Sequence, residues 1–324
     1  MIRAGAILSF LLLIWSCSSG EPRKLSENIT VQDSSRQSVG DTITETTIQA
    51  RDSVAYSIEV GYDVPVKKYF RFMDSVIAAA DTLALGYKPD EYILVHANPW
   101  IIDTLQSFDY YRLMERGIFV YDQTQLIVLK KGTKLFMPDS LWANSIRDKL
   151  KHTIIDVNIP EFTLRVYQYD KKVLECKVRV GRNADEFLQV VGRSVNLKTP
   201  IGKGEIVRIA REPYYINPRT GKKYDKTRRD DGKYTLMPII PWIEPSINGL
   251  RYGAMIHPTT NPETLGKTYS HGCVGTTEHD AWFIYYNAPI GTPVIFRYDL
   301  QVIQPNGDTL FLKDIYGLGQ KKKK

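Results

Sequence analysis

A histidine and a cysteine, His257 and Cys273, lie sixteen positions apart towards the end of the chain. A thiol attacks an acyl carbon as its thiolate, and only a small fraction of a free cysteine is ionised near neutral pH. It therefore needs a base, which His257 supplies if the intervening loop folds back. Gly272 permits a sharp turn in which backbone N–H groups converge on the oxyanion of the attacked carbonyl. The pattern predicts acyl transfer, and its alternative is a buried cysteine beside loop histidines.

The remaining cysteines predict other roles. The chain has three cysteines, Cys17, Cys176 and Cys273. Cys176 lies in residues 173–180, where apolar and polar residues alternate as in a strand, which predicts a buried structural side chain. No histidine or cysteine pair has the spacing of metal ligands, and no glycine-rich phosphate loop follows a predicted strand. We expect neither a metal nor a cofactor.

The elements that would position the pair are mostly strands. Short apolar runs bounded by Gly and Pro are typical of a mainly β domain. One helix is expected, over residues 278–287, with Thr276 or Thr277 as its N-cap. The expected strands cover residues 153–157, 163–169, 173–180, 204–210, 254–257 and 293–298.

The first residues predict export. Arg3 precedes an apolar stretch over residues 4–15, which is too short to cross a bilayer comfortably. Residues 14–17 resemble the bacterial lipobox, which implies cleavage before Cys17 and lipidation of its sulfur. Ser18, rather than Asp, then favours the outer membrane, with the protein facing the periplasm. An ordinary signal peptide and a retained membrane anchor are the alternatives.

The composition divides the chain into five segments. Residues 1–16 are the expected lipoprotein signal peptide, and residues 17–57, rich in Ser, Thr, Gln, Glu and Asp, a disordered tether. Residues 58–150 are expected to form a small α+β domain with a helix at 67–85, strands at 92–96 and 125–129, and His96 in the core. Residues 151–300 form the predicted catalytic domain, and residues 301–324 a C-terminal extension with a lysine tail.

The charge does not indicate a nucleic-acid partner. The chain has 43 Lys and Arg against 36 Asp and Glu, and four of the cations form the terminal run 321–324. No basic stripe interleaved with aromatic residues is present. The long stretch 211–244 includes a cluster of cations, which we interpret as a solvated loop or a cover of the cleft: Lys222, Lys223, Lys226, Arg228 and Arg229. The sequence does not predict an oligomeric state.

The segment from His257 to Gly275 closely resembles the active-site motif of the L,D-transpeptidase (YkuD-like) family, which is a His, a spacer and then Ser-His-Gly-Cys. The resemblance covers about residues 152–298. Other stretches in family order are residues 154–157, 162–167, 177–181, 198–204 and 251–257. It implies a β-sandwich catalytic domain.

The resemblance also implies a role for each residue of the motif. Cys273 would be the nucleophile, His257 its base, and the backbone carbonyl of Pro258 the group that orients the base. Backbone N–H groups of residues 271–273 would form the oxyanion hole, including that of Gly272, with Ser270 and His271 shaping the pocket. The chain departs from the family at Gly275, where Arg is common, so the resemblance does not say what anchors a substrate carboxylate.

The implied substrate is a stem peptide of peptidoglycan. Cys273 would attack the carbonyl before a terminal D-Ala, release D-Ala, and pass the acyl group to another stem in a 3→3 cross-link. Water as acceptor would make an L,D-carboxypeptidase, and a protein lysine an anchoring enzyme. A non-catalytic wall-binding lipoprotein and a general cysteine peptidase are the rivals from other classes. The expected partners are stem peptides and, through the lipid anchor, a membrane.

Overall fold

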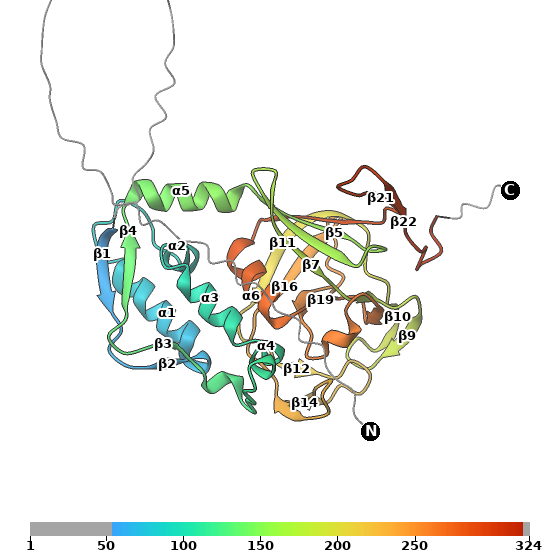
Figure 1. The fold of residues 1–324 in the computed structure, drawn as a ribbon, viewed down its shortest axis with the longest axis horizontal. Coiled ribbons are helices and arrows are strands. Elements are labelled where there is room, and N and C mark those ends of the chain that lie inside the picture. Colours follow the sequence, from blue (N-terminus) through green and yellow to red (C-terminus); the bar gives the residue numbers. More distant parts are fainter. Residues whose placement is uncertain (1–53, 320–324) are drawn as a thin grey trace, which may run out of the picture. The chain divides into compact units, whose positions relative to one another are not determined.

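The structure, a computed structural model, describes residues 54–319 (Figure 1). The expected signal peptide, the lipidation residue Cys17, most of the expected tether and the lysine tail lie outside the described residues. The last four residues of the expected tether are wrongly assigned, because Val54 begins strand β1 (Val54–Glu59). This strand pairs with β4 (Lys134–Pro138), so the folded part starts earlier than the composition indicated.

The N-terminal region combines helices with two short strand pairs. Strand β2 (Val64–Pro65) pairs with β3 (Ile127–Leu129). Helix α1 (Val66–Ala80) confirms the helix expected at 67–85, although it ends five residues earlier, and its buried side chains recur at helical spacing. A 3-10 turn covers Gln123–Gln125. The other helices are α2 (Glu91–His96), α3 (Trp100–Ser107), α4 (Tyr110–Glu115) and α5 (Ser140–Lys151).

The strand expected at residues 92–96 is wrong, because these residues form helix α2. A short apolar run fits a buried helix as well as a strand, and periodicity cannot separate the two. Asp90 decides the outcome locally, since its side chain accepts a hydrogen bond from the backbone N–H of Ile93 at 2.9 Å as an N-cap. At the other end of the helix, His96 Nε2 lies 2.8 Å from the backbone carbonyl of Tyr286.

The C-terminal region is built on an eight-stranded sheet. Its strand order is β19-β17-β16-β11-β20-β5-β6-β7. The strands are β5 (Thr153–Asn158), β6 (Thr163–Gln168), β7 (Lys171–Lys177), β11 (Gly202–Ala210), β16 (Trp242–Ile247), β17 (Ile256–Pro258), β19 (Val274–Thr276) and β20 (Pro293–Arg297). The strands predicted from sequence are present, except that the run expected at 173–180 is divided between β7 and β8.

Five two-stranded sheets complete the region. They pair β8 (Val180–Gly181) with β18 (Thr268–Ser270), β9 (Asp185–Leu188) with β10 (Arg193–Asn196), β12 (Tyr215–Ile216) with β13 (Lys223–Tyr224), β14 (Lys226–Arg228) with β15 (Tyr234–Leu236), and β21 (Gln301–Ile303) with β22 (Thr309–Phe311). A mainly β domain preceded by a small α+β region is therefore confirmed as the fold class.

The two end strands of the large sheet meet at one point. Arg179, two residues beyond β7, forms a bridge with Gly275 of β19. Each backbone N–H of the pair donates to the carbonyl of the other at 2.9 Å. The sheet thus nearly closes on itself, and the closure lies next to Cys273.

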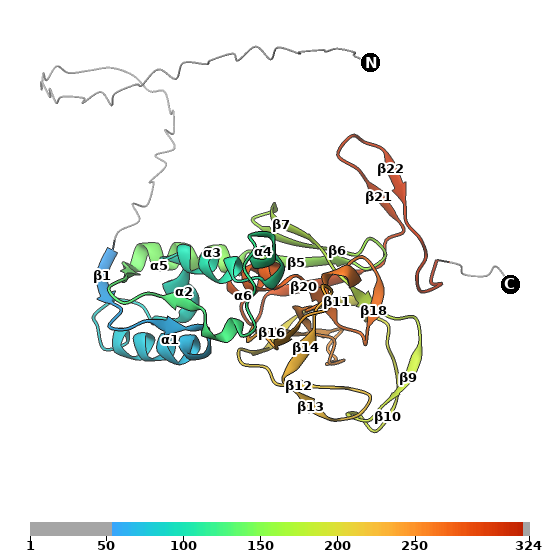
Figure 2. The same ribbon diagram turned by 60° about the horizontal axis from the view of Figure 1, so that its bottom comes forward.

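Helix α6 (Glu278–Asn287) joins the two regions through one hydrophobic core. Thr277 caps it by accepting a hydrogen bond from the backbone N–H of Asp280 at 2.9 Å, which agrees with the expected helix and cap. Its aromatic side chains pack against α1, with ring centroids of Phe70 and Trp282 6.2 Å apart. The helix lies between the helical and sheet parts in both views (Figures 1 and 2). Seven of the ten residues of α6 are buried, which agrees with a position between two parts of the core.

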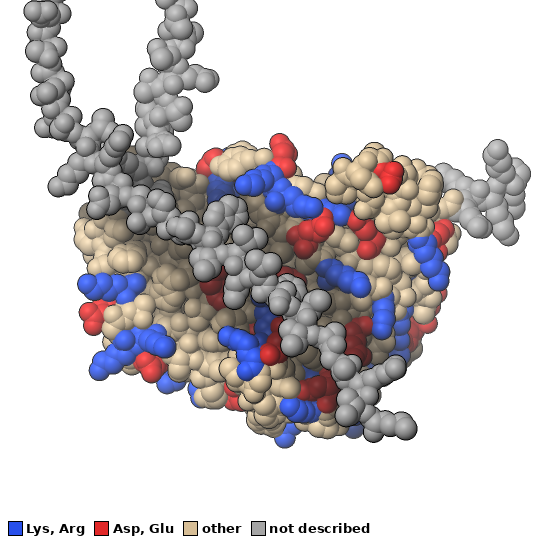
Figure 3. All heavy atoms as spheres, viewed as in Figure 1, with Lys and Arg blue, Asp and Glu red and all other residues tan. Residues whose placement is uncertain are grey.

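The visible surface shows no large area of one charge sign. On the face drawn in Figure 3, basic and acidic side chains are interspersed over the described residues. Within residues 54–319, no helix has both the length and the apolar character needed to cross a membrane.

Candidate active site

The structure places His257 and Cys273 on neighbouring strands. Strands β17 and β19 are parallel, with Ile256 opposite Val274 and His257 opposite Gly275. Cys273 directly precedes β19, and the next residue donates its backbone N–H to the carbonyl of Met255 at 2.9 Å. The segment between His257 and Cys273 therefore folds back, and it brings the imidazole and the thiol to the same end of the strand pair.

The ring of His257 is held from two sides. Its Nδ1 lies 2.8 Å from the carbonyl of Pro258, and because a carbonyl only accepts, Nδ1 carries the proton. Nε2 is then the nitrogen available as a base. The ring also stacks on Trp242, with centroids 4.4 Å apart. Burial, together with the positive charge of Arg179, lowers the pKa of His257 to about 3. The imidazole is therefore neutral at physiological pH.

The thiol of Cys273 is also uncharged at rest. Burial raises its pKa, while a backbone hydrogen bond from Met255 and the charge of Arg179 act in the opposite direction. The thiol donates to the carbonyl of Gly253 at 3.7 Å. Within residues 54–319 the structure shows no hydrogen bond between this thiol and His257. Proton transfer to His257 requires the thiol to leave its contact with Gly253.

The turn before Cys273 is braced by Ser270. The Ser270 hydroxyl donates to the carbonyl of Cys273 at 2.6 Å and accepts from the backbone N–H of Gly272 at 3.2 Å. Gly272 has φ of 110°, a backbone conformation that side-chain-bearing residues avoid. Because its N–H is engaged with Ser270, Gly272 can serve as an oxyanion donor only by exchanging this partner for a substrate oxygen.

His271 lies in the same turn, but its side chain is not fixed by the protein. Its Nε2 is buried, and no partner for it is found among the described residues. Burial and the neighbouring Arg182 lower the pKa of His271. Its ring is thus a neutral group that lies beside the turn rather than in the strand pair that carries His257.

A support beneath this turn was not predicted from the sequence. Thr199 donates its hydroxyl to the carbonyl of Gly272 at 3.0 Å, and accepts from the backbone N–H of Gly181 at 2.9 Å. Tyr316, from the C-terminal extension, donates to the carbonyl of Gly181 at 2.7 Å and accepts from the N–H of Thr199 at 3.1 Å. A lone tyrosine in a terminal extension gives no sequence signal of such a contact.

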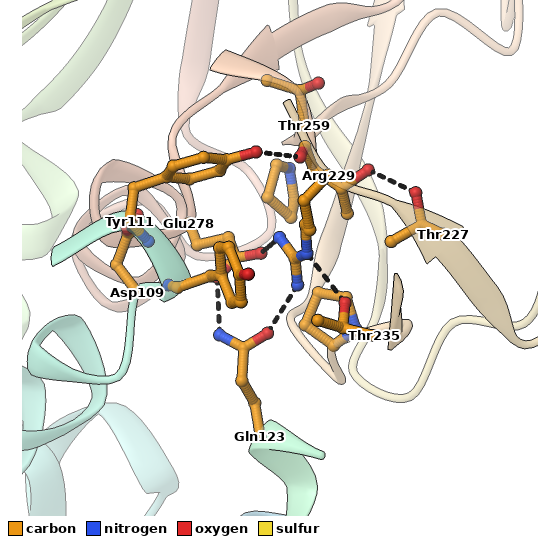
Figure 4. Close-up of polar contacts among 12 residues, drawn as sticks. Asp109, Tyr111, Gln123, Thr227, Arg229, Thr235, Thr259 and Glu278 are labelled. Atoms are coloured by element: carbon orange, nitrogen blue, oxygen red, sulfur yellow. Dashed lines mark hydrogen bonds and ion pairs between the residues drawn. The ribbon is translucent and has the colours of Figure 1, made fainter. Parts of the chain in front are cut away.

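One cation of the loop 211–244 is not solvated. Lys222, Lys223, Lys226 and Arg228 are exposed, whereas Arg229 is buried, with 2 % of its surface accessible. Its guanidinium donates to Glu278 at 2.6 Å, to Gln123 at 2.8 Å and to Thr235 at 2.8 Å (Figure 4). It also lies 4.4 Å from the centre of the Tyr110 ring. The interpretation as a solvated loop is wrong for this residue.

The helical region also reaches the loop that follows His257. Tyr111 of α4 donates its hydroxyl to the carbonyl of Thr260 at 3.0 Å (Figure 4). The same hydroxyl accepts from the backbone N–H of Asp230 at 2.8 Å. Tyr111 thus connects the N-terminal region to the segment that carries the base, and Gln123 and Tyr110 connect it to Arg229 and Glu278.

In the part of the chain that the structure describes, no group of three or more His, Cys, Asp or Glu side chains is placed to hold a metal ion.

Known proteins were found to be similar to this chain at two levels, solved structures and a family model. Several solved L,D-transpeptidases resemble the chain with TM-scores near 0.3. The L,D-transpeptidase from Mycobacterium smegmatis is 14% identical, with a TM-score of 0.31, and the match covers 51% of this chain and 63% of that one. The one from Xylanimonas cellulosilytica is 11% identical, with a TM-score of 0.33, and the match covers 74% of this chain and 97% of that one. The one from Enterococcus faecium is 19% identical, with a TM-score of 0.31, and the match covers 45% of this chain and 50% of that one.

The chain spans less than two thirds of the mycobacterial protein, and no curated protein matches it. The model of the L,D-transpeptidase catalytic domain, YkuD, matches residues 152–296, the region that contains both His257 and Cys273. Residues 152–296 are thus a catalytic domain of the YkuD L,D-transpeptidase family.

Proposed function

We propose that this protein is a peptidoglycan L,D-transpeptidase that uses Cys273 as its nucleophile and His257 as its base. One observation carries the proposal. The imidazole lies on the strand next to the cysteine, with Nδ1 held by the Pro258 carbonyl, so that Nε2 is left to take the thiol proton. The family match over residues 152–296 supports the reaction class.

In the first half-reaction the thiol attacks the carbonyl that joins the third residue of a stem tetrapeptide to its terminal D-Ala. Sγ bonds to that carbon while its proton passes to Nε2 of His257. Backbone N–H groups of residues 271–273 hold the oxyanion. The C–N bond then breaks, and the imidazolium gives its proton to the departing amine of D-Ala. A thioester on Cys273 remains.

In the second half-reaction an amine from another stem attacks the thioester. His257 takes the proton of the amine, the C–S bond breaks, and the sulfur recovers a proton. The product is a 3→3 cross-link. The oxygen of the thioester carbonyl accepts from the same backbone N–H groups as the oxygen of the first carbonyl, so one oxyanion hole serves both half-reactions.

The proposed place of action is the cell envelope. The stretch before Cys17 supports export and lipid attachment, because it is basic, then apolar, and ends with a small residue before the cysteine. A lipid anchor followed by a polar segment of several tens of residues gives the catalytic domain reach from the membrane. Stem peptides are the proposed partners.

The test is the analysis of muropeptides by mass spectrometry after purified sacculi are incubated with the protein. We expect 3→3 linked dimers and free D-Ala with the wild-type protein and with Cys176→Ala, and neither with Cys273→Ala. Cys176 is the matched control, because it is a free cysteine buried in β7, away from the turn. D-Ala release without dimers would identify a carboxypeptidase, and activity in Cys273→Ala would overturn the mechanism.

A further inference from the structure

Arg179 occupies the space that Gly275 leaves free. A Cβ atom placed on Gly275 would lie 2.6 Å from Nε, 2.7 Å from Cγ and 3.0 Å from Cδ of Arg179. These distances are shorter than van der Waals contact, so the side chain of Arg179 crosses directly over the glycine. The pair is also locked by two reciprocal backbone hydrogen bonds of 2.9 Å. The glycine of β19 and the arginine beyond β7 thus form one unit.

The charge of Asp230 acts on Arg179, but no carboxylate forms a direct ion pair with Arg179 within residues 54–319. Its Nη1 donates to the hydroxyl of Thr264 at 3.3 Å, and its Nε is buried without a partner within residues 54–319. No ion pair of Arg179 occurs among the described residues. A buried N–H donor without a partner costs free energy unless a ligand completes its hydrogen bond. The structure therefore holds an arginine that is prepared for an anion.

The position of this cation is next to the nucleophile. Gly275 is two residues after Cys273 in an extended strand, and each residue of a strand advances about 3.3 Å. The charge of Arg179 acts on both partners: it helps to lower the pKa of His257, and it opposes the rise that burial causes in the pKa of Cys273. Arg179 is half-buried rather than fully enclosed, so part of its residue surface is open to solvent. The arginine lies beside an accessible surface at the site.

We propose that Arg179 binds the terminal carboxylate of the donor peptide, the carboxylate of the D-Ala that leaves. The proposal rests on the proposed function, since it names a group of that substrate. In a tetrapeptide this carboxylate lies one residue beyond the carbonyl that Cys273 attacks. The side chain of Arg179 lies over Gly275, which is two residues after Cys273, so the cation is placed at a similar distance from the sulfur. A guanidinium binds a carboxylate through two parallel N–H···O bonds, and it does so better than a lysine ammonium.

Arg179 follows β7, whereas Cys273 and Gly275 belong to the segment of β19, so the cation comes from a different strand than the nucleophile. A side chain at position 275 would displace Arg179, and Arg179 needs a glycine opposite it. The position of the Arg179 side chain therefore depends on the absence of a side chain at Gly275. If Arg179 only filled space, its replacement by a neutral side chain of similar length would affect all substrates alike.

The experiment compares two donor peptides that differ in one group, a stem tetrapeptide with a free terminal carboxylate and the same peptide with a terminal amide. We expect Arg179→Gln to lower kcat/KM for the acid about 10- to 100-fold, because hydrogen bonds to charged groups contribute about 1.5–3 kcal/mol. The amide should react slowly with the wild-type protein and no more slowly with Arg179→Gln. Arg179→Lys should recover only part of the activity on the acid.

Two further variants separate binding from folding. Gly275→Ala should reproduce the loss of Arg179→Gln, and the two changes together should cost no more than one. Lys171→Gln, an exposed cation at the start of β7, is the control and should leave both rates unchanged. An equal loss on acid and amide in Arg179→Gln would overturn the proposal. A loss that instead follows amidation of a side-chain carboxylate of the stem would also overturn it.

Binding distinguishes a failure of this inference from a failure of the proposed function. In the Cys273→Ala background, calorimetry should show that the acid binds more tightly than the amide, and that Arg179→Gln removes the difference. If the wild-type protein turned over neither peptide, the proposed function would fail while this binding comparison still decided the role of Arg179. Equal binding of acid and amide in Cys273→Ala would contradict the carboxylate site.

Discussion

The imidazole of His257 and the thiol of Cys273 are both neutral in the resting site, because burial lowers the pKa of the first and raises that of the second. Cys273 and His257 therefore do not form a thiolate–imidazolium ion pair in the resting site. Proton transfer has to occur as the sulfur attacks, which is general-base catalysis in the strict sense. Arg179 favours the thiolate but opposes the imidazolium, so an anion bound to Arg179 would ease the protonation of His257.

This electrostatic arrangement predicts how the thiol reacts with iodoacetamide. Because the pKa of Cys273 is raised, the alkylation rate of the wild-type protein should increase from neutral towards alkaline pH. His257→Ala should be alkylated at least ten times more slowly at neutral pH, given the usual contribution of a general base, and should recover partly at alkaline pH. Alkylation followed by intact-protein mass measures these rates.

His271→Ala is the matched control for this experiment, since His271 lies in the same turn as Cys273 but outside the strand pair. Its alkylation profile should stay close to that of the wild-type protein. If thiol reactivity fell only in His271→Ala, the base would be His271 and the contact between His257 and Pro258 would have no catalytic meaning.

At the scale of elements, the site depends on parts that are distant in the sequence. Strands β17 and β19 present the base and the nucleophile, and the loop after β17 is held by Tyr111 of α4. Arg229 ties the loop 211–244 to the start of α6 and to Gln123 of the N-terminal region. A buried ion pair of this kind adds little net stability, but breaking it leaves an unpaired charge.

Replacement of Arg229 tests this connection. Arg229→Ala leaves the carboxylate of Glu278 buried without its cation, and should lower the free energy of unfolding by about 3–5 kcal/mol. Arg228→Ala, a change of the exposed neighbour, should alter it by less than about 0.5 kcal/mol. Urea unfolding followed by circular dichroism measures both. Equal stability of the two variants would show that the buried contacts of Arg229 do not support the fold.

The sequence predicted those elements whose signals are local. The catalytic strands and helix α6 follow from alternation, turn residues and the cap at Thr277, and all of these act within a few residues. Helix α2 was mistaken for a strand, because four apolar residues in a row carry no period. Arg179, Arg229 and Tyr316 act through contacts with distant segments. No pattern in the sequence marks such contacts, so the structure alone revealed them.

At the scale of the whole molecule, the N-terminal region and the catalytic domain share one hydrophobic core. The hydroxyls of Tyr69 in α1 and Tyr286 in α6 are hydrogen-bonded at 2.6 Å. The carboxylate of Glu91 in α2 accepts a hydrogen bond from the Tyr286 hydroxyl at 2.8 Å. The described residues are accordingly one folded unit rather than two independent ones. We infer that the helical region supports the catalytic domain.

The proposed lipid anchor makes a prediction for the intact chain. Cys17→Ala removes the sulfur that would carry the lipid, so the exported protein should move from the membrane fraction to the soluble periplasmic fraction. Cys176→Ala should remain in the membrane fraction as the control. Fractionation followed by immunoblotting provides the measurement. Membrane association of Cys17→Ala equal to that of the wild-type protein would contradict lipidation at this residue.

Whether Cys273 carries the acyl group is decided by the mass of the protein after incubation with a stem tetrapeptide. In the absence of an acceptor amine, we expect one adduct, with the mass of the peptide minus D-Ala, on the proteolytic fragment that contains Cys273. His257→Ala should form it more slowly, and Cys273→Ala not at all. An adduct on Cys176, or D-Ala released with no thioester at any time, would contradict the account.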